Sequence, residues 1–356
     1  MELDFINSIC ASAGHHGASD IFLHVEQLPQ FRINGELVTV GDKVVTPDQM
    51  EAFWYWCGVE KETLDFDGSF VSSDGRRFRV NFFRSLFKRG AVLRQIKTVI
   101  PSLDSLGVPT SLLTSWITRP SGLVLVTGPT GSGKSTTVAS CLDWLNQNYP
   151  RHIVTIEDPI EYLFLPARCL FTQRELYSDT PTFAEGLRRS LRQSPDVILL
   201  GEIRDSESAV TALQAAETGH LVMATMHSSN VLESLERLSR LFKPDEREGI
   251  LQLLSKQLTG ILCQKLIPAI PDGNVLVVEY FENQAVTRKY IGEEKFRDLS
   301  DFLAKGDNAL SVTFLQSLVS MVKTGRISEA IAGQFASNPH ELQRQLRGIS
   351  SSSVKV

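Results

Sequence analysis

The stretch GPTGSGKS, residues 128–135, constrains the fold of this chain more than any other part of its sequence. It fits the phosphate-binding pattern G-x-x-x-x-G-K-[ST] at every fixed position, and it stands between an apolar strand-like run and a helical segment. Glycines let backbone N–H groups turn inward around phosphate oxygens, and the start of a helix adds positive potential. The pattern predicts that Lys134 reaches the β and γ phosphates of ATP and that Ser135 holds Mg²⁺. The residues expected to contact the nucleotide are Gly128, Pro129, Thr130, Gly131, Ser132, Gly133, Lys134, Ser135 and Thr136.

From about residue 116 onward, short apolar runs alternate with helical segments. The runs GLVLVT, HIVTIED, DVILLGE and LVMATMH are rich in Val, Ile, Leu and Met. Continuous apolar strands separated by helices are typical of a parallel sheet that is covered on both faces. We therefore expect an α/β fold here, with a further helical stretch through residue 266 and a mostly helical C-terminal part.

Acidic residues follow two of these runs. Glu202 comes directly after DVILLG, and an apolar strand that ends in an acid is where P-loop NTPases place the Walker B group. Glu157, Asp158 and Glu161 follow the run HIVTI. Since ligands of open α/β sheets bind at the carboxyl ends of the strands, we expect these acids near the phosphate loop. Carboxylates there can bind Mg²⁺ through water or position an attacking water, and the residues alone do not choose among the three.

Two of the seven histidines, His220 and His227, bracket the run LVMATM. At ~3.3 Å per residue, a strand over this run would separate them by more than about 20 Å, on opposite edges of the sheet. His227 would lie at the carboxyl end, which is the nucleotide edge. His220 follows a helix-ending glycine, and we expect it to serve the fold or a contact between subunits.

The first 98 residues are typical of a separate mixed α+β domain. After an opening helix, residues 17–40 suggest short strands separated by turns. Thr46 has the sequence context of a helix N-cap, with Pro47 at the first helical position and Gln49 completing a capping box. The run RRFRVNFFRSLFKRGAVLRQI alternates basic and apolar residues and predicts two strands.

A change of composition separates this domain from the phosphate loop. Residues 99–115 carry two prolines, a glycine and several serines and threonines, which favours an interdomain linker. The expected division is therefore an N-terminal domain over 1–98, a linker over 99–115 and an ATPase domain over 116–356.

Charge and composition exclude several classes of protein. A net charge of −5 argues against a dedicated nucleic-acid binder, which usually shows a basic face. The N-terminus has neither a basic segment nor a long apolar segment, so no signal peptide is expected. The apolar runs are far shorter than the ~20 residues of a membrane-spanning helix. The five cysteines form no CxxC pair, which disfavours a zinc knuckle or a disulfide framework. We expect a soluble cytoplasmic protein.

Taken together, the motifs resemble the secretion ATPase superfamily, and most closely the retraction motors of type IV pili. The segments that carry the resemblance run in the family's order over nearly the whole chain: GASDIFL, LPQFRINGEL, RFRVNFF, GPTGSGKSTT, TIEDPIEY, DVILLGEIRD and TGHLVMATMHSSN. In that family the last three are the Asp box, the Walker B motif and the His box. The resemblance implies an N-terminal PAS-like domain, a C-terminal RecA-like ATPase domain, and a ring of six subunits with ATP at the interfaces between them.

The resemblance also implies roles by position. Glu161 looks like the catalytic glutamate that polarises the attacking water, Glu202 like the Walker B acid near Mg²⁺, and His227 like a sensor of the γ-phosphate. In the family, arginines of the N-terminal region reach the phosphates, and Arg79 and Arg94 occupy matching positions. The alternative for both arginines is a solvated strand face. The implied cofactors are ATP and Mg²⁺, with Ser135 and Glu202 binding the metal partly through water.

A retraction motor of this kind would couple ATP hydrolysis to pilus disassembly and twitching motility, at the inner face of the bacterial inner membrane. The implied partners are five further copies in a homohexamer, the inner-membrane platform protein of the pilus and a paralogous pilus ATPase, with no nucleic acid.

Two departures from related motors bear on this interpretation. The four-cysteine zinc motif and the longer N-terminal region of assembly motors are missing, which favours retraction. The AIR-containing motif that retraction motors commonly carry is reduced here to Val286, Thr287 and Arg288. The alternatives are an accessory retraction ATPase, a related type II/IV secretion-system ATPase and a nucleotide-gated regulator with little hydrolysis. The acidic balance disfavours a fourth, a RecA-like DNA motor.

Overall fold

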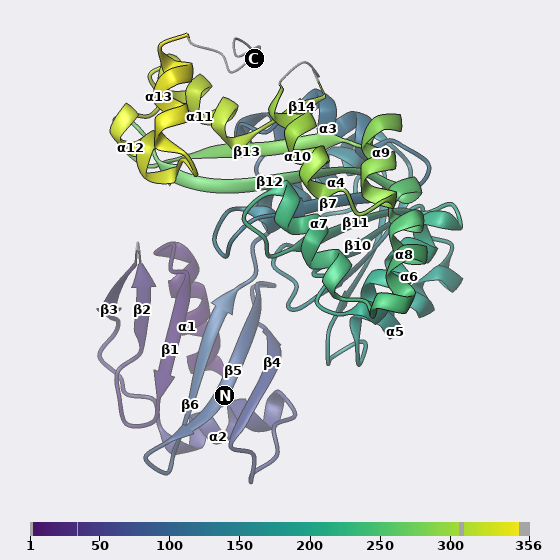
Figure 1. Cartoon of the computed structure of the whole chain (residues 1–356). Helices are drawn as coiled ribbons and strands as arrows, with labels where there is room; N and C mark the ends of the chain where they lie inside the picture. Colours follow the sequence, from purple (N-terminus) through teal and green to yellow (C-terminus); the bar gives the residue numbers. More distant parts are fainter. Residues whose placement is uncertain (1–2, 34, 306–309, 349–356) are drawn as a thin grey trace, which may run out of the picture. The chain divides into compact units, whose positions relative to one another are not determined.

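The computed structural model describes residues 3–33, 35–305 and 310–348, and the chain divides into two compact units (Figure 1). Unit 1 comprises Met1–Thr98 together with Glu161–Leu163, and unit 2 comprises Val99–Ile160 and Phe164–Val356. Within the described residues, none of the helices combines the length and the apolar character that a membrane span requires.

Unit 1 is built on an antiparallel sheet with the strand order β3-β2-β1-β6-β5-β4. The capping box expected at Thr46 is present and starts the second helix. The strand β4 lies in a segment for which no strand was predicted. The elements are α1 (Asp4–His15), β1 (Asp20–His24), β2 (Gln30–Ile33), β3 (Glu36–Thr39), α2 (Pro47–Trp56), β4 (Asp65–Val71), β5 (Arg77–Ser85) and β6 (Lys88–Gln95).

The sheet of unit 1 has one apolar and one polar face. In β5, Phe78, Val80 and Phe82 are fully buried, and they alternate with partly exposed residues that include Arg79. Successive side chains of a strand point to opposite faces, so Arg77 and Arg79 lie on the face away from this core. On the core side, Phe82 packs edge-on against Trp54 of α2, with 5.7 Å between the ring centroids.

Unit 2 contains the phosphate loop and the remaining elements. Those that surround the loop are β7 (Gly122–Thr127), α4 (Lys134–Asn148), β8 (His152–Glu157), β9 (Leu170–Glu175), α5 (Phe183–Ser190), β10 (Val197–Leu200), α6 (Ser206–Glu217), β11 (Leu221–Met226), α7 (Val231–Arg240) and α8 (Pro244–Gln257). The later elements are β12 (Leu258–Pro268), β13 (Asn274–Glu282), α9 (Ala285–Gly292), α10 (Phe296–Ala304), β14 (Ser311–Val312), α11 (Phe314–Lys323), α12 (Glu329–Phe335) and α13 (Pro339–Leu346).

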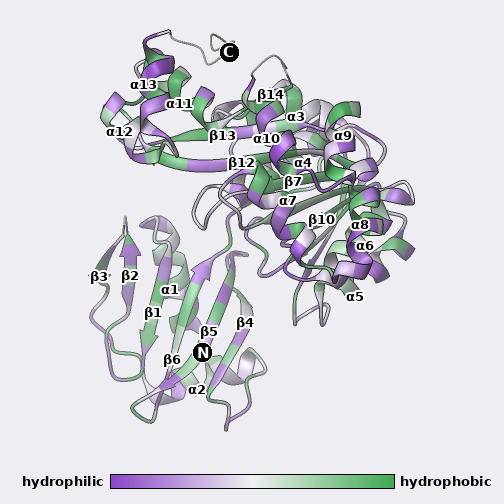
Figure 2. Ribbon diagram, in the orientation of Figure 1, coloured by the Kyte–Doolittle hydropathy of each residue, from purple (hydrophilic) through white to green (hydrophobic). Residues whose placement is uncertain are grey.

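The sheet of unit 2 has the strand order β14-β13-β12-β7-β11-β10-β8-β9. Strands β12 to β9 in this order pair in parallel, and β13 and β14 join antiparallel. All residues of β7 and β11 are buried, which requires cover on both faces of the sheet, and Figure 2 shows hydrophobic residues along the central strands. The expected α/β fold with a parallel sheet is therefore confirmed.

The expectation of a helical stretch through residue 266 is wrong in its last part, residues 258–266. Helix α8 ends at Gln257, and the run LTGILCQKLIP forms β12, parallel to β7. A short apolar run does not distinguish a buried strand from a buried helix by periodicity alone. Gly260 lets this strand approach the ring of Trp116 closely, since a Cβ there would lie 2.5 Å from the ring.

The stretch 99–115, which we expected as a linker, belongs to unit 2 and is partly folded. It contains a 3₁₀ turn (Leu103–Leu106) and most of α3 (Thr110–Ile117). Leu103 and Leu113 are buried in it, so apolar packing holds a segment whose prolines and small polar residues suggested a flexible connection.

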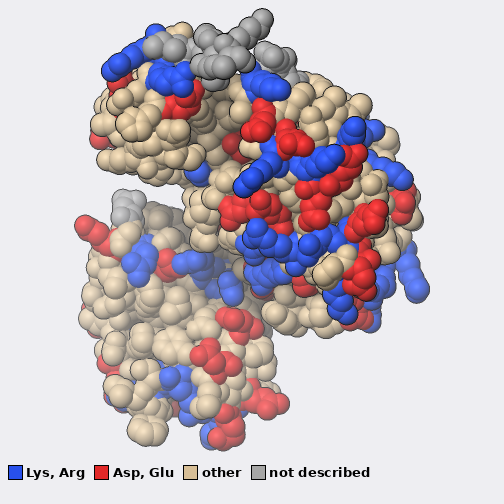
Figure 3. Space-filling model, in the orientation of Figure 1, with Lys and Arg blue, Asp and Glu red and all other residues tan. Residues whose placement is uncertain are grey.

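Charged residues of both signs alternate on the face of unit 2 that Figure 3 shows. Helix α7 carries Glu233, Glu236, Arg237 and Arg240, and the Arg240 guanidinium pairs with Glu236 at 2.7 Å one turn away. Pairs of this spacing stabilise a helix only modestly.

Candidate nucleotide-binding site

Parallel strands of unit 2 bring their carboxyl ends to one edge of the sheet. The ends of β7 and β11 are level, because Thr127 pairs with Met226, and β10 lies between β11 and β8. The segments that follow these strands therefore leave the sheet at the same edge. They carry the phosphate loop, His227, Glu202 and the acids after β8. This is the edge at which open α/β sheets bind ligands.

The phosphate loop leads from the end of β7 directly into α4. Gly128, Gly131 and Gly133 have φ values of 149°, 77° and 87°, a region that residues with a side chain rarely adopt. A Cβ on Gly128 would lie 2.5 Å from the carbonyl oxygen of Gln264 and from the hydroxyl of Ser132. The loop thus needs glycine at its first position, and it ends at the N-terminus of α4, where unpaired N–H groups favour an anion.

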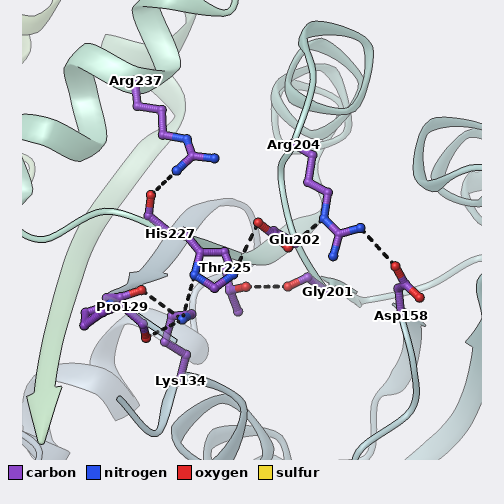
Figure 4. Close-up of polar contacts among 10 residues, drawn as sticks. Pro129, Lys134, Asp158, Gly201, Glu202, Arg204, Thr225, His227 and Arg237 are labelled. Atoms are coloured by element: carbon purple, nitrogen blue, oxygen red, sulfur yellow. Dashed lines mark hydrogen bonds and ion pairs between the residues drawn. The ribbon is translucent and has the colours of Figure 1, made fainter. Parts of the chain in front are cut away.

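Lys134 is the first residue of α4 and is buried, with 8% of its surface exposed. Its Nζ donates to the carbonyl oxygens of Gly128 and Pro129 at 2.9 Å each, and it lies 3.5 Å from Nδ1 of His227 (Figure 4). The ammonium group is therefore held over the phosphate loop by two neutral acceptors. Phosphate oxygens are stronger partners for an ammonium group, so a nucleotide can take their place.

Glu202, two residues beyond the end of β10, forms the acidic centre of the site. Its Oε2 accepts from Nε of Arg204 at 2.7 Å, and Nη1 of Arg204 lies 3.0 Å from Oδ2 of Asp158. One guanidinium thus joins the acid after β10 to an acid after β8, as Figure 4 shows. Arg204 has no predicted role, although it stands in the motif DVILLGEIRD.

His227 lies between the lysine and the acid. Its Nε2 is 3.5 Å from Oε1 of Glu202, and its carbonyl oxygen accepts from the guanidinium of Arg237 in α7. Burial and the neighbouring Lys134 ammonium lower the pKa of His227 from its ordinary 6.5, so the imidazole is neutral at pH 7. A neutral imidazole can accept or donate a hydrogen bond beside a phosphate without adding a charge.

The motif residues also start the helices that follow. Asp205 accepts from the backbone N–H of Ser208 at 2.7 Å and caps α6, and Asn230 accepts from Glu233 at 2.8 Å and caps α7. Side chains of this kind satisfy donors that a helix leaves unpaired at its start. The last residues of DVILLGEIRD and TGHLVMATMHSSN thus shape the backbone near Glu202 and His227.

His220 lies immediately before β11, at the other end of the strand. Its Nδ1 is 3.1 Å from the carbonyl oxygen of Ala215 and 3.3 Å from the hydroxyl of Thr218. Both partners belong to the end of α6, so the ring closes the connection between that helix and the strand.

The three acids after β8 have different surroundings. Glu157 accepts from the hydroxyl of Thr155 at 2.7 Å, and Asp158 pairs with Arg204. Glu161 is exposed and belongs to unit 1, where its carbonyl oxygen accepts from the backbone N–H of Lys97 at 3.2 Å.

Arg79 and Arg94 also belong to unit 1, where they face each other across β5 and β6. Their side chains are 38% and 71% exposed. Nε of Arg94 lies 2.7 Å from Asp20, which is buried, and Arg79 lies 3.7 Å from Asp67. Like charges directly opposite each other destabilise a sheet, and here each arginine has an acid as a neighbour.

The site offers few protein ligands for a metal ion. Among the residues that the structure describes, no group of three or more His, Cys, Asp and Glu side chains could hold one. Ser135 is exposed at the start of α4, and Glu202 supplies a carboxylate at the same edge of the sheet. Mg²⁺ typically keeps waters and binds one or two carboxylates plus substrate phosphates, and this donor set fits that chemistry. The buried hydroxyl of Ser132 has no hydrogen-bond partner in the loop.

Comparison with known proteins agrees with this geometry. Residues 67–300 match the family described as "Type II/IV secretion system protein", and the chain belongs to that family.

Within this family the chain is PilT-like. It is 36% identical over 340 residues to the protein named "Type IV pilus retractation ATPase PilT" of Pseudomonas aeruginosa, which covers 94% of this chain and 98% of that protein. It is 34% identical to the type IV pilus ATPase PilU of the same organism, over 93% of this chain and 88% of PilU. A crystal structure of the pilus retraction motor PilT with bound ADP superimposes with a TM-score of 0.86 at 38% identity, over 95% of this chain and 99% of that chain.

Proposed function

We propose that this chain is an ATP-hydrolysing motor that drives the retraction of a type IV pilus. The proposal is supported by the likeness to PilT over nearly the full length of both chains. The observation that carries it is the contact series Lys134, His227 and Glu202 beside the phosphate loop, with 3.5 Å between neighbours. P-loop ATPases use a lysine over the phosphate loop and an acid near Mg²⁺ in phosphoryl transfer, and here a neutral imidazole lies between the two.

We propose that ATP binds with its β and γ phosphates in the loop from Gly128 to Thr136. Lys134 would exchange the carbonyl oxygens of Gly128 and Pro129 for phosphate oxygens and neutralise the charge that spreads over the γ-phosphate. Ser135 and Glu202 would hold Mg²⁺, which supplies Lewis-acid stabilisation of the phosphate charge when bound. His227 would contact the γ-phosphate and report its presence to α7 through Arg237.

We assign the general base to Glu161. The family resemblance favours this residue, and the two other acids after β8 already have partners in Thr155 and Arg204. An exposed carboxylate can accept the proton of the attacking water and release it to solvent after turnover.

We propose that the active form is a ring of six copies, in which Arg79 and Arg94 contact the phosphates of a neighbouring subunit. The exposed arginine pair on the polar face of unit 1 supports this role, because an anion between the two guanidinium groups would relieve their repulsion. Arginine suits this role since its planar group contacts phosphate through two N–H donors. We also propose that unit 1 is a PAS-like domain.

We further propose that the ring works at the cytoplasmic face of the inner membrane, against the platform protein of a pilus, with a PilU-like paralogue as a second partner. Nucleic acid has no place in this proposal. The support is the resemblance to retraction motors, together with the likeness to PilU.

The second candidate function is that of an accessory retraction ATPase or a secretion-system ATPase, and the reduced AIR motif favours it. The segment forms α9, in which Thr287 is buried, accepts from the N–H of Gln284 at 2.7 Å and donates to Asn283 at 2.8 Å. A capping threonine thus stands in the middle of the motif remnant. This is a specific change in a segment that retraction motors need.

The experiment that separates the candidates is complementation of a strain that lacks its own retraction ATPase and retains its pili. We expect the chain to restore pilus retraction and the Lys134→Ala variant to fail at equal expression. Retraction that appears only when the resident motor is also present would support the accessory role instead. Turnover of ATP in vitro without retraction in either strain would overturn the pilus assignment and favour a secretion system.

A further inference from the structure

Glu279 in strand β13 is a carboxylate that the proposed hydrolysis does not use. Its Oε1 accepts from the backbone N–H of Val231 at 2.7 Å, and its Oε2 accepts from the backbone N–H of Phe314 at 3.1 Å. Val231 is the first residue of α7 and Phe314 is the first residue of α11. One side chain therefore serves the N-termini of two helices that lie far apart in the sequence.

The first of these contacts fixes the turn that carries His227. This turn, residues 227–230, connects β11 to α7, and it is held on the same side by Cys263, whose thiol lies 3.6 Å from the carbonyl oxygen of Ser228. Cys263 and Glu279 face each other across β12 and β13. The β12–β13 hairpin thus contacts the turn between His227 and α7 at two points, Ser228 and Val231.

Helix α7 in turn contacts residues of the phosphate site. Ser234 in its first turn lies 2.6 Å from the hydroxyl of Ser228 and donates to Thr127 at 3.1 Å, directly before the phosphate loop. Arg237, one turn later, donates to the carbonyl oxygen of His227. A displacement of the start of α7 would therefore displace His227 relative to Lys134 and Glu202.

The second contact connects the same carboxylate to the C-terminal helices. Thr313 caps α11 with a full capping box, and Ser317 accepts from the backbone N–H of Val278 at 3.4 Å. Helix α11 is thereby tied to β13 at two neighbouring residues, Val278 and Glu279. A carboxylate at a helix N-terminus also gains from the partial positive charge there.

We propose that Glu279 is a positioning residue that holds His227 in register with the γ-phosphate and couples this register to helix α11. The inference rests on the proposed role of His227 in hydrolysis. It predicts that the site loses its sensor geometry, but not its nucleotide affinity, when the carboxylate can no longer serve both helices.

The decisive variant is Glu279→Gln, because glutamine keeps the size of the side chain but offers a single acceptor oxygen. We expect kcat for ATP to fall about tenfold, in keeping with the cost of a small misplacement of a catalytic group. The affinity for ADP, which has no γ-phosphate, should change by less than about twofold. In a His227→Ala background, the further effect of Glu279→Gln on kcat should also be under about twofold, because the two residues act through one group.

A second variant breaks the same contact from the helix side. Val231→Pro removes the donated N–H and leaves Glu279 intact, and proline is accepted at the first position of a helix. The preceding Asn230 is extended, with φ −160° and ψ 173°, which suits a residue before proline. We expect the same fall in kcat, and its appearance in a second folded variant protects the test against a failure of Glu279→Gln to fold.

The matched control is Asn283→Ala. Asn283 is also a buried polar side chain that holds two backbone groups of another segment, the carbonyl oxygens of Ser255 at 2.8 Å and Leu258 at 2.9 Å. It should lower the melting temperature and leave kcat within about twofold of the unmodified chain. An equal fall of kcat in this control, or additive effects of Glu279→Gln and His227→Ala, would overturn the positioning role. Unchanged turnover in His227→Ala alone would instead refute the proposed site itself.

Discussion

The two ends of strand β11 carry the same side chain in opposite surroundings. At the amino end, His220 contacts the carbonyl oxygen of Ala215 and the hydroxyl of Thr218, which belong to the closing turn of α6. At the carboxyl end, His227 lies 3.5 Å from an ammonium and 3.5 Å from a carboxylate.

The difference follows from the polarity of parallel strands. Each helix ends at the amino edge of the sheet, where it presents carbonyl oxygens, and the next one begins beyond the carboxyl edge, where it presents N–H groups. Only the second edge has the positive potential that binds a phosphate. The same residue type therefore completes the fold at one edge and belongs to the proposed reaction site at the other.

The largest effect is expected from the residue proposed to activate water. Glu161→Gln should lower kcat by on the order of 10² to 10³, because the amide cannot accept the proton of the attacking water, while ATP still binds. Steady-state turnover and the affinity for a fluorescent ATP analogue measure the two parts. Glu157→Gln is the control, and a larger loss in that variant would move the catalytic role to the acid beside Thr155.

The arginine pair of unit 1 should come next. Arg79→Ala and Arg94→Ala should each lower the turnover of the assembled protein by at least about tenfold. This loss is smaller than the loss expected for a single arginine that contacts the γ-phosphate across an interface. Arg32→Ala is the matched control, since Arg32 lies two strands from Arg94 on the same face and also approaches Asp20, at 3.7 Å. Equal losses in all three variants would indicate a general effect of charge on this face.

The two histidines test the comparison itself. His227→Ala should lower kcat about tenfold with little change in ADP affinity, whereas His220→Ala should leave kcat within about twofold and lower the melting temperature by a few degrees. The melting effect follows from the loss of its contacts with Ala215 and Thr218. A fall of kcat in His220→Ala, measured well below its melting temperature, would contradict the division of roles between the two edges.

The smallest effect concerns the pH dependence of stability. The folded-state pKa of His227 is lowered, so below about pH 6.5 the unfolded chain binds more protons at this residue than the folded chain. The free energy of unfolding should therefore fall as the pH drops from 6.5 to the folded-state pKa, and this part of the loss should be absent in His227→Gln. Denaturant midpoints at pH 7.5 and pH 5.5 for both proteins measure it. A larger acid loss in the variant would contradict the neutral imidazole.

Much of this site follows from the sequence because strand polarity is readable there. Apolar runs that end in Glu202 and His227 identify the carboxyl edge, and the glycine pattern identifies the phosphate loop. Arg204 and Arg237 were not predicted, since their roles depend on contacts with Asp158 and with a backbone carbonyl that no spacing reveals.

The fold was less readable where an apolar segment lacked a clear period. Buried strands and buried helices share composition, so the residues of β12 do not distinguish the two, and it is the pairing with β7 that makes this segment a strand. The role of Glu279 could not be predicted from the sequence for a similar reason. Its two partners are backbone N–H groups of helices that begin 48 residues before it and 35 residues after it.

The most direct test of a phosphate site that is completed between subunits is the rate of ATP hydrolysis per subunit across a dilution series with Mg²⁺. The proposed motor predicts measurable turnover that falls on dilution, together with Arg79→Ala and Arg94→Ala variants that stay slow at every concentration. Turnover independent of concentration would show that one chain is sufficient. Binding of ATP without turnover at any concentration would contradict the motor and support a regulator that depends on a partner ATPase.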